Sequence, residues 1–376
     1  MQYPKRMGIL GGGQLGKMML PVAMGYDLEV HIMDPDPSCP CAKWTPHFFK
    51  GDLRNEADVV AFGQRVDILT IEFEHVNVPA LKTLVAQGKQ VYPQPEVIEI
   101  LQDKAQQNQF YLSQAIPTPE FVVVDQAVDL SEYAYFLPAV QKLRFLGYDG
   151  KGVVKLKNTQ DLCKGFSEPS LLEKWVDIDY ELSVLVVQNL HKTQVVYPPV
   201  QVYTHPTSDL LDYLISPAPI SSELSQKAEA IAKKIAKKLG IVGILAVEFF
   251  LTKSGELLVN ECAPRPHNSG HHTIEAFDYS QFDQHIRAVL GLPLHQPTMI
   301  APSIMKNILG TSPENWDAFQ KKVFPCLAWP SSYLHWYGKE SSKPFRKMGH
   351  LTVLADSVET LNDRLQSIHT LLGDPL

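Results

Sequence analysis

Residues 246–261 read Ala-Val-Glu-Phe-Phe-Leu-Thr-Lys-Ser-Gly-Glu-Leu-Leu-Val-Asn-Glu, and this stretch decides the fold of the middle of the chain. Two apolar runs flank the Lys-Ser-Gly-Glu sequence at 253–256, a pattern that predicts a β-hairpin. A turn centred between residues 254 and 255 would pair 248 with 261, 250 with 259 and 252 with 257. Glu248 and Glu261 would then face each other on one side of the hairpin, with Cβ atoms about 5 Å apart.

Two carboxylates in this position repel each other unless a proton or a divalent cation lies between them. The flanking residues are apolar, so a solvated surface explains the pair poorly, and Asn260 adds another oxygen. The spacing also suits a retaining glycosidase, and a shifted register would leave one glutamate exposed. Magnesium with a nucleotide accounts for the pair together with the lysine and the glycine-rich segment described below. We therefore predict Glu248 and Glu261 as metal ligands.

The segment directly after Glu261 reads CAPRPHNSGH and is dense in polar groups. Its two prolines stiffen the chain and disfavour helix and sheet. A rigid loop leaving a metal-bearing strand can aim Arg265 and His267 at an anion beside the metal. Arginine offers a planar fork for a carboxylate or bicarbonate, and histidine can donate a hydrogen bond or move a proton. The alternative is a polar surface loop.

A lysine and a glycine-rich segment lie about a hundred residues earlier. Lys142 ends a predicted strand, and Gly-Tyr-Asp-Gly-Lys-Gly at 147–152 precedes the predicted strand Val153–Leu156. The glycines predict a mobile hairpin tip whose amides can close over phosphates, and Lys142 can place a charge on the same phosphates. The alternative is a simple β-turn at Asp149-Gly150.

Near the N-terminus, residues 11–16 read GGGQLG between a predicted strand and a predicted helix. This G-x-G-x-x-G pattern, followed by Asp34 at the end of the next strand, is typical of a nicotinamide cofactor site. The pattern alone is equally consistent with a tight strand-to-helix turn that binds no dinucleotide. A nicotinamide-dependent dehydrogenase therefore remains an alternative at this point.

The organisation of the chain changes at about residue 103. Before it, strands and helices alternate, which predicts a parallel α/β sheet. After it, strands are joined by turns or single helices, and a last segment from about residue 295 ends in a helix around 358–372. One central helix is clear, with an apolar stripe from Leu224 to Leu239, a stop at Gly240 and lysines on its solvent face.

Composition narrows the class of protein. The chain has 376 residues, 45% hydrophobic and 20% charged, which is typical of a globular protein. A net charge of −7 argues against a broad nucleic-acid interface. No stretch has the length of a membrane helix, and the apolar run ending at Leu10 is too short for a signal peptide. Five cysteines, with Cys39 and Cys41 as a lone C-x-C, predict free thiols in a cytoplasmic enzyme rather than a disulfide framework or a zinc site.

Taken together, the sequence resembles the ATP-grasp ligases, and within them the family of 5-(carboxyamino)imidazole ribonucleotide synthases of purine biosynthesis. The resemblance spans nearly the whole chain. It is carried by GILGGGQLGKM at 8–18, TIEFEHV at 70–76, LGYDGKG at 146–152, VEFF with VNECAPRPHNSGHHT up to 273, and HWYGKE and RKMGHLT near the end. The resemblance implies an ATP-grasp fold with an N-terminal Rossmann-like domain at 1–103, an ATP-grasp domain at 104–295 whose lid ends near 180, and a small C-terminal domain at 296–376.

The resemblance also implies roles for individual residues. Those that would bind ATP are Lys104, Lys142, Gly147, Tyr148, Asp149, Gly150, Lys151, Gly152, Val153, Glu173, Lys174, Trp175, Val176, Glu181, His205, Asn260 and Glu261. Magnesium, with manganese as an alternative, would be held by Glu248 and Glu261. Bicarbonate and the intermediate derived from it would meet the catalytic residues Arg265, His267 and Lys339. The ribonucleotide would contact Gly13, Gln14, Leu15, Glu74, Tyr148, Asp149, Lys339 and Arg346.

The implied reaction uses ATP and bicarbonate to carboxylate the exocyclic amine of aminoimidazole ribonucleotide, through carboxyphosphate. The partners would be these small molecules, without nucleic acid or membrane, and the family tendency implies a homodimer. Lys104, Val153 and His272 depart from residues common in the family. Two further alternatives stay open: a different ATP-grasp carboxylase or ligase, and a nucleotide-binding module without catalysis.

Overall fold

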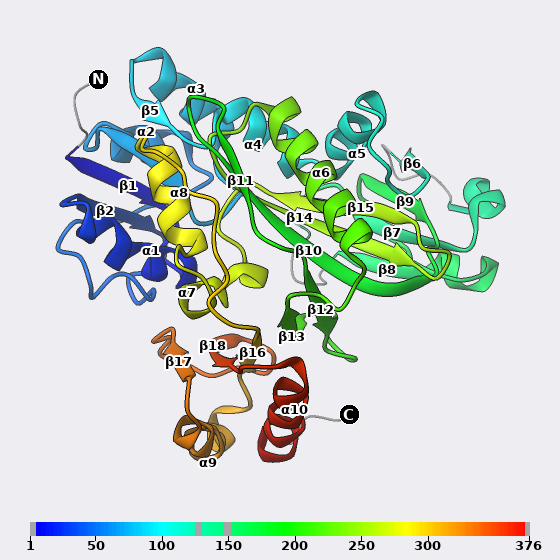
Figure 1. Cartoon of the computed structure of the whole chain (residues 1–376). Coiled ribbons are helices and arrows are strands. Elements are labelled where there is room, and N and C mark those ends of the chain that lie inside the picture. Colours follow the sequence, from blue (N-terminus) through cyan, green and yellow to red (C-terminus); the bar gives the residue numbers. More distant parts are fainter. Residues whose placement is uncertain (1–4, 125–129, 146, 148–151, 373–376) are drawn as a thin grey trace.

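The computed structural model describes residues 5–124, 130–145, 147 and 152–372. Figure 1 shows a parallel sheet with its helices in the N-terminal part, two antiparallel sheets in the middle, and a smaller C-terminal part below them. The predicted combination of an α/β part with an α+β part is confirmed. The residue limits of the three domains stay a prediction.

The N-terminal sheet is parallel, with the strand order β3-β2-β1-β4-β5. Its elements are β1 (Arg6–Leu10), α1 (Gln14–Gly25), β2 (Glu29–Asp34), β3 (Phe48–Lys50), α2 (Glu56–Gly63), β4 (Ile68–Ile71), α3 (Val78–Ala86) and β5 (Gln90–Val91). Helix α1, joined by α8 (Gln281–Val289), packs on one face, and α2 and α3 pack on the other. The central strands are therefore buried on both faces, as is usual for a parallel sheet.

A small antiparallel sheet follows, with the order β6-β9-β7-β8. Two helices lead into it, α4 (Pro95–Gln102) and α5 (Lys104–Ser113), and its strands are β6 (Phe121–Val124), β7 (Ala139–Leu143), β8 (Val153–Leu156) and β9 (Ser170–Lys174). Short 3-10 helices cover residues Leu130–Phe136 and Thr159–Lys164. This sheet carries Lys142 on β7 and Val153 on β8, which both line the cavity described below.

The large antiparallel sheet runs β15-β14-β10-β12-β13-β16-β18-β17, with β11 paired to β10. Its strands are β10 (Ile178–Gln188), β11 (Gln194–Val196), β12 (Val200–Thr204), β13 (Leu211–Ser216), β14 (Gly243–Thr252), β15 (Leu257–Ala263), β16 (Ser303–Leu309), β17 (Ser332–Trp336) and β18 (Lys347–Leu354). The helices of this part are α6 (Ser222–Leu239), α7 (Thr273–Ala276), α9 (Pro313–Val323) and α10 (Val358–Leu372). Because β16 pairs with β13, the C-terminal strands continue the sheet that carries the glutamate pair.

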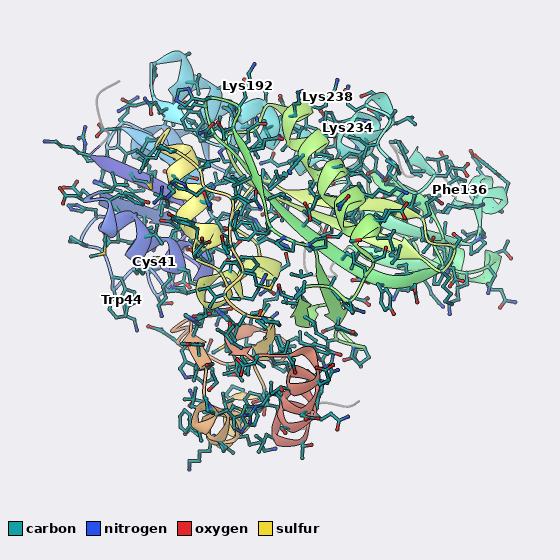
Figure 2. The ribbon with its side chains drawn as sticks, viewed as in Figure 1. Cys41, Trp44, Phe136, Lys192, Lys234 and Lys238 are labelled. Atoms are coloured by element: carbon teal, nitrogen blue, oxygen red, sulfur yellow. The ribbon has the colours of Figure 1, made fainter. Side chains whose placement is uncertain are left out.

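Helix α6 covers the large sheet and forms its main core. Ser221 caps the helix by accepting a hydrogen bond from the Leu224 amide at 3.2 Å, and Gly240 ends it with a φ of +67°. The helix buries small and branched side chains against β10 and β14. Figure 2 shows Lys234 and Lys238 on the outer side of this helix, and both are exposed, so the lysine-rich face is solvated as predicted.

None of the helices among the described residues is long and apolar enough to cross a membrane. All five cysteines are free thiols, in agreement with the sequence prediction.

Candidate active site

A cavity of about 730 Å³ lies where the two antiparallel sheets, helix α5 and the carboxyl end of the N-terminal sheet meet. A cavity of this size suits a nucleotide-sized ligand. Most predicted site residues that the structure describes line it: Gln14, Leu15, Glu74, Lys104, Lys142, Gly147, Val153, Glu173, Lys174, Trp175, Val176, Glu181, Glu248, Asn260, Glu261, Arg265 and His267. Outside the lining are Gly13, Gly152, His205, Lys339 and Arg346. The predictions for Tyr148, Asp149, Gly150 and Lys151 lie outside the described residues.

Glu248 and Glu261 are paired across the β14–β15 hairpin, as predicted. The other predicted pairs, 250 with 259 and 252 with 257, are wrong, because Phe250 pairs with Leu258 and residue 251 with 257. The loop holds three residues, closed by the Thr252 amide on the Glu256 carbonyl at 2.9 Å, with residue 255 at a φ of +82°. Three-residue hairpin loops with a left-handed glycine are common.

A β-bulge at Asn260 restores the glutamate pair, since Phe249 pairs with Val259 while Glu248 pairs with Glu261. Successive strand residues normally point to opposite faces, so Asn260 and Glu261 would not both reach the cavity in a regular strand. With the bulge both line it, and Val259 remains in the core beneath. Two carboxylates and one amide oxygen gathered on one wall form the donor set of a hard divalent cation.

The charges of the pair are unequal. Burial raises the pKa of Glu248 to about 8, and the carboxylates of Glu261 and Glu181 act in the same direction. Burial also acts to raise the pKa of Glu261, but Lys104 and Lys142 outweigh it and hold that pKa below its usual value. The protein therefore neutralises one carboxylate with its own cations and leaves the other short of a positive partner. A divalent cation between the two supplies that partner, so these residues fit magnesium.

Two lysines contact residues of this cavity wall or its neighbours. Lys104, in the first turn of α5, makes an ion pair with Glu261. Lys142, on β7, donates to Oδ1 of Asn260 at 2.8 Å and lies 2.6 Å from Oε2 of Glu173. Both ammonium groups thus lie beside the cluster of oxygen ligands, where they can neutralise the phosphates of a nucleotide.

Arg144 also lines the cavity, and the sequence analysis missed it. Its guanidinium donates twice to Asp103, from Nε to Oδ1 at 3.0 Å and from Nη2 to Oδ2 at 2.6 Å. Asp103 also caps α5 by accepting from the Ala105 amide at 2.9 Å. The pair joins the end of β7 to the helix that begins with Lys104. The available signal was the two-residue period of a strand, which puts residues 142 and 144 on one face.

The segment behind Glu261 points Arg265 and His267 into the cavity. Arg265 makes a two-pronged ion pair with Glu74, in which Nη2 lies 2.9 Å from Oε1. Burial acts to raise the pKa of Glu74, but Arg265 outweighs it and lowers this pKa to about 2, so the pair is ionised at neutral pH. The two predicted residues, 191 positions apart, therefore meet each other in this structure.

His267 is held as a neutral donor. Burial lowers its pKa to about 3, and Arg265 and Lys347 act in the same direction. Its Nδ1 accepts from the Ser269 amide at 3.3 Å, which places the proton on Nε2, 3.5 Å from Oε1 of Glu248. In this state the imidazole can donate a hydrogen bond to a ligand near the glutamate pair, whereas proton uptake near neutral pH is disfavoured.

The glycine loop is already occupied by the protein's own carboxylates. The amides of Gly13 and Leu15 each donate to Glu72 at 3.2 Å, and the amide of Gly12 donates to Asp34 at 2.7 Å. A Cβ atom at Gly11 or Gly13 would collide with the Glu72 carboxylate, so these glycines make room for that side chain. A dinucleotide or a phosphate on these amides would have to displace Glu72. The nicotinamide interpretation of the motif is therefore disfavoured.

The loop after β17 closes against the same end of the N-terminal sheet. Lys17, on α1, donates to the carbonyls of Trp336 and Tyr337 at 2.7 and 3.2 Å. In this loop Lys339 donates to the Lys347 carbonyl at 2.6 Å, and Arg346 donates to the Ser341 carbonyl at 2.9 Å. The predicted residues Lys339 and Arg346 thus lie near the glycine loop but are turned toward their own segment.

The remaining residues predicted to bind ATP are the linker Lys174–Val176, Glu181 and His205. The linker Lys174–Val176 and the β10 residue Glu181 line the cavity. Burial and Asp209 raise the pKa of Glu181. His205 is held in its own turn instead, with Nδ1 3.1 Å from Oγ1 of Thr207 and its ring against Phe345.

Lys347 also lines the cavity, and the sequence analysis assigned it no role. It opens β18, more than eighty residues after the glutamate hairpin, and although it lies within the RKMGHLT stretch, nothing in that stretch indicates that its side chain reaches this cavity. Nearby, Asn268 and Asn307 exchange amide hydrogen bonds at 3.0 and 2.7 Å, which attaches the segment of Arg265 and His267 to β16.

A nucleotide-sized cavity between two antiparallel sheets, with paired acidic side chains on one sheet and a lysine on the other, defines an ATP-grasp ligase. Family models agree in all three parts of the chain. They are the ribonucleotide synthetase preATP-grasp domain over residues 4–102, the ATP-grasp domain over 109–282, and the phosphoribosylaminoimidazole carboxylase C-terminal domain over 303–364.

Individual relatives show which family of ATP-grasp ligases the chain resembles. The N5-carboxyaminoimidazole ribonucleotide synthase of Staphylococcus aureus is 36% identical over 95% of both chains. The chloroplastic phosphoribosylaminoimidazole carboxylase of Vigna aconitifolia is 37% identical over 96% of this chain, which spans 66% of that relative's length. The crystal structure of the Aspergillus clavatus N5-carboxyaminoimidazole synthase with ADP and 5-aminoimidazole ribonucleotide has 29% identity, covers 99% of this chain and 100% of its own, and superimposes with a TM-score of 0.91. The chain belongs to the N5-carboxyaminoimidazole ribonucleotide synthase family.

Proposed function

We propose that this chain carboxylates the exocyclic amine of 5-aminoimidazole ribonucleotide with ATP and bicarbonate, yielding 5-(carboxyamino)imidazole ribonucleotide, ADP and phosphate. One observation carries the proposal: Glu248 and Glu261, Lys142, and the pair Arg265 and His267 all line one nucleotide-sized cavity. The Staphylococcus and Aspergillus relatives bear the name of this activity, and the Aspergillus structure holds ADP with the aminoimidazole substrate.

In the first step bicarbonate attacks the terminal phosphorus of ATP, and ADP leaves with carboxyphosphate as the other product. The protein's contribution to such a transfer is mainly alignment and charge neutralisation. Lys104 and Lys142 approach the phosphates from α5 and β7, and Glu248, Glu261 and Asn260 would hold magnesium or manganese. When bound, that ion would neutralise charge on the transferred phosphoryl group.

In the second step the exocyclic amine takes the carboxyl group and phosphate leaves. Arg265 offers bicarbonate and its derivative a planar fork, but in this structure the fork is held by Glu74. An anion beside Arg265 would share the guanidinium with Glu74 or displace it. His267, neutral with its proton on Nε2, would donate to a carboxyphosphate oxygen near the metal. Since carboxyphosphate is labile in water, closure of the cavity over it would protect the intermediate.

The ribonucleotide is assigned to the end of the cavity between the glycine loop and the loop after β17. Gln14, Leu15 and Glu74 line the cavity there, and Lys339 and Arg346 lie on the loop that Lys17 attaches to this end. The roles of Gly13, Tyr148 and Asp149 stay predictions of the sequence, as do the homodimer and the cytoplasmic location.

The test is an assay of ADP release with purified protein, ATP and magnesium, in which bicarbonate and 5-aminoimidazole ribonucleotide are supplied separately and together. We expect the fastest release, with the ribonucleotide consumed in equal amount, only when both are present. ADP release that is equally fast without the ribonucleotide, and without its consumption, would favour another ATP-grasp ligase. ATP binding without any ADP release would indicate a non-catalytic module.

A further inference from the structure

A second group of possible metal ligands lies at the other end of the N-terminal sheet. Glu29 and His31 are two residues apart on β2, so their side chains share one face of the sheet. His47 directly precedes the edge strand β3, and its carbonyl accepts from the Ile32 amide at 3.1 Å. The strand register therefore brings together three side chains that the sequence separates by up to eighteen positions.

The three side chains lie in contact with one another. Nε2 of His31 lies 2.6 Å from Oε1 of Glu29, and Nε2 of His47 lies 3.7 Å from Oε2 of the same carboxylate. The two imidazole rings stack, with 4.5 Å between centroids and 15° between planes. One ligand atom from each residue falls within 4.8 Å of the others. This is the only group of three or more such side chains found among the described residues.

The group is partly preorganised. His31 has 12% of its side chain exposed and is fixed between its neighbours, whereas Glu29 and His47 have 47% and 39% exposed and can adjust. Tetrahedral zinc with nitrogen ligands at about 2.0–2.1 Å needs ligand atoms roughly 3.4 Å apart. Small rotations of Glu29 and His47 would reach that spacing, and the fourth position would be open to water.

The chemical types of these three side chains indicate which metal ions they would bind. Two imidazoles and one carboxylate favour borderline-soft divalent ions such as zinc over magnesium or calcium, which prefer oxygen ligands only. Apart from the two histidines, the cation that acts electrostatically on Glu29 is Arg6, and its guanidinium is already paired with Asp67 at 2.6 Å. The local charge therefore does not exclude a divalent ion.

We propose that Glu29, His31 and His47 form a binding site for a first-row divalent metal ion, with zinc as the probe, that clamps the edge strand β3 to β2. The ion would replace the hydrogen bond between His31 and Glu29 and cross-link two strands that otherwise share a short ladder. The site is independent of the catalytic reaction. The loops that reach the catalytic cavity follow β1 and β4 at their carboxyl ends, whereas Glu29 begins its strand.

The experiment is a zinc titration of the full chain by calorimetry, with saturating magnesium and ADP present so that the catalytic cavity is occupied. The variants are Glu29→Gln, His31→Ala and His47→Ala, and the matched control is His191→Ala, an exposed histidine outside the group. Loss of a hydrogen-bond partner of a metal ligand typically lowers metal affinity by about 10- to 100-fold. Because each variant removes a ligand itself, we expect zinc affinity to fall by at least about 10-fold in each of them. The control should bind like the original chain.

A thermal unfolding measurement separates binding from misfolding. Zinc should raise the melting temperature of the original chain and of His191→Ala, because it binds the folded state, and should raise that of His47→Ala much less. Glu29→Gln and His47→Ala change exposed side chains, so they report even if His31→Ala does not fold. Equal zinc affinity in Glu29→Gln, His47→Ala and the original chain would overturn the proposal, as would an equal loss in His191→Ala. Synthase activity should stay unchanged in Glu29→Gln and His47→Ala.

Discussion

The glycine loop and the glutamate hairpin both hold acidic side chains in segments for which the sequence predicts a function. The two regions differ in how the negative charges of these side chains are compensated. At the glycine loop, Glu72 accepts hydrogen bonds from two amides, and its carboxylate fills the space that the glycines leave. At the hairpin, Glu248 faces Glu261, and the lysines compensate only one of them.

The role of a motif therefore depends on whether its polar groups already have hydrogen-bond or ion-pair partners within the protein. Buried groups with internal partners mainly support the fold. Buried groups that repel each other persist where a ligand or ion completes them. By this criterion the backbone amides of the loop at 11–16 mainly support the fold, and the hairpin is where we expect the chemistry. Each prediction below tests one side of that contrast.

The largest effect is expected at the hairpin. Glu261→Ala removes one of the two carboxylates that would hold the metal, and we expect kcat for ADP formation to fall by at least about 100-fold, as for loss of a main transition-state contact. The matched control is Glu256→Gln, an exposed glutamate on the same hairpin, which should keep normal turnover. Near-normal turnover of Glu261→Ala at saturating magnesium would show that the metal assignment is wrong.

At the glycine loop the expected effect is on stability. Glu72→Ala removes the acceptor for two partly buried amides, and we expect the free energy of unfolding to drop by about 2 kcal/mol. Denaturant unfolding followed by circular dichroism measures the change, with Glu99→Ala, an exchange of a partly exposed glutamate on α4, as the control. If Glu72→Ala were as stable as the original chain, the hydrogen bonds from the loop amides to Glu72 would not contribute to stability.

His285, on α8, offers a pH test of another buried group whose hydrogen-bond partners lie within the protein. It is fully buried, accepts from the Ile244 amide at 3.2 Å and bonds Thr70 on β4 at 2.8 Å, and burial lowers its pKa to about 3. Between about pH 6.5, the usual histidine pKa, and pH 3, the unfolded chain binds a proton that the folded chain does not, so stability falls as pH falls.

His285→Gln should therefore flatten the stability profile. Within that window the unfolding free energy of the original chain should decrease more steeply, by up to about 1.4 kcal/mol per pH unit, than that of the variant. Unfolding titrations at pH 6, 5 and 4 measure the slopes, and the exposed His191→Gln serves as the control. Identical slopes for His285→Gln and the original chain would contradict a neutral buried imidazole.

The last prediction is that a nicotinamide cofactor has no effect. Because Glu72 already accepts from the glycine-loop amides, NADH should not bind there, and its fluorescence should not change when the protein is added. ADP, followed by calorimetry under the same conditions, provides the positive control. Saturable NADH binding that ADP does not displace would mean that the loop can release Glu72 to a dinucleotide, which would weaken the contrast between the two regions.

Much of the fold followed from local signals. Short apolar runs predicted β1, β2 and β4, and the hairpin turn predicted β14 and β15. The glutamate pair was predicted correctly although the assumed turn was one residue off, because the bulge at Asn260 compensates. Neither the loop type nor the bulge has a strong local signal in this sequence, so the register could not be read from it.

By itself, the sequence determined which residues are ionisable, which segments form strands and helices, and which motifs are candidates for the chemistry, because turn residues and apolar periodicity act over a few neighbouring positions. Only the tertiary structure decided that Glu72 fills the glycine loop, that Arg265 meets Glu74, and that Lys347 joins the cavity. Those contacts span about sixty residues or more of chain, and they depend on how whole sheets pack, which no local pattern encodes.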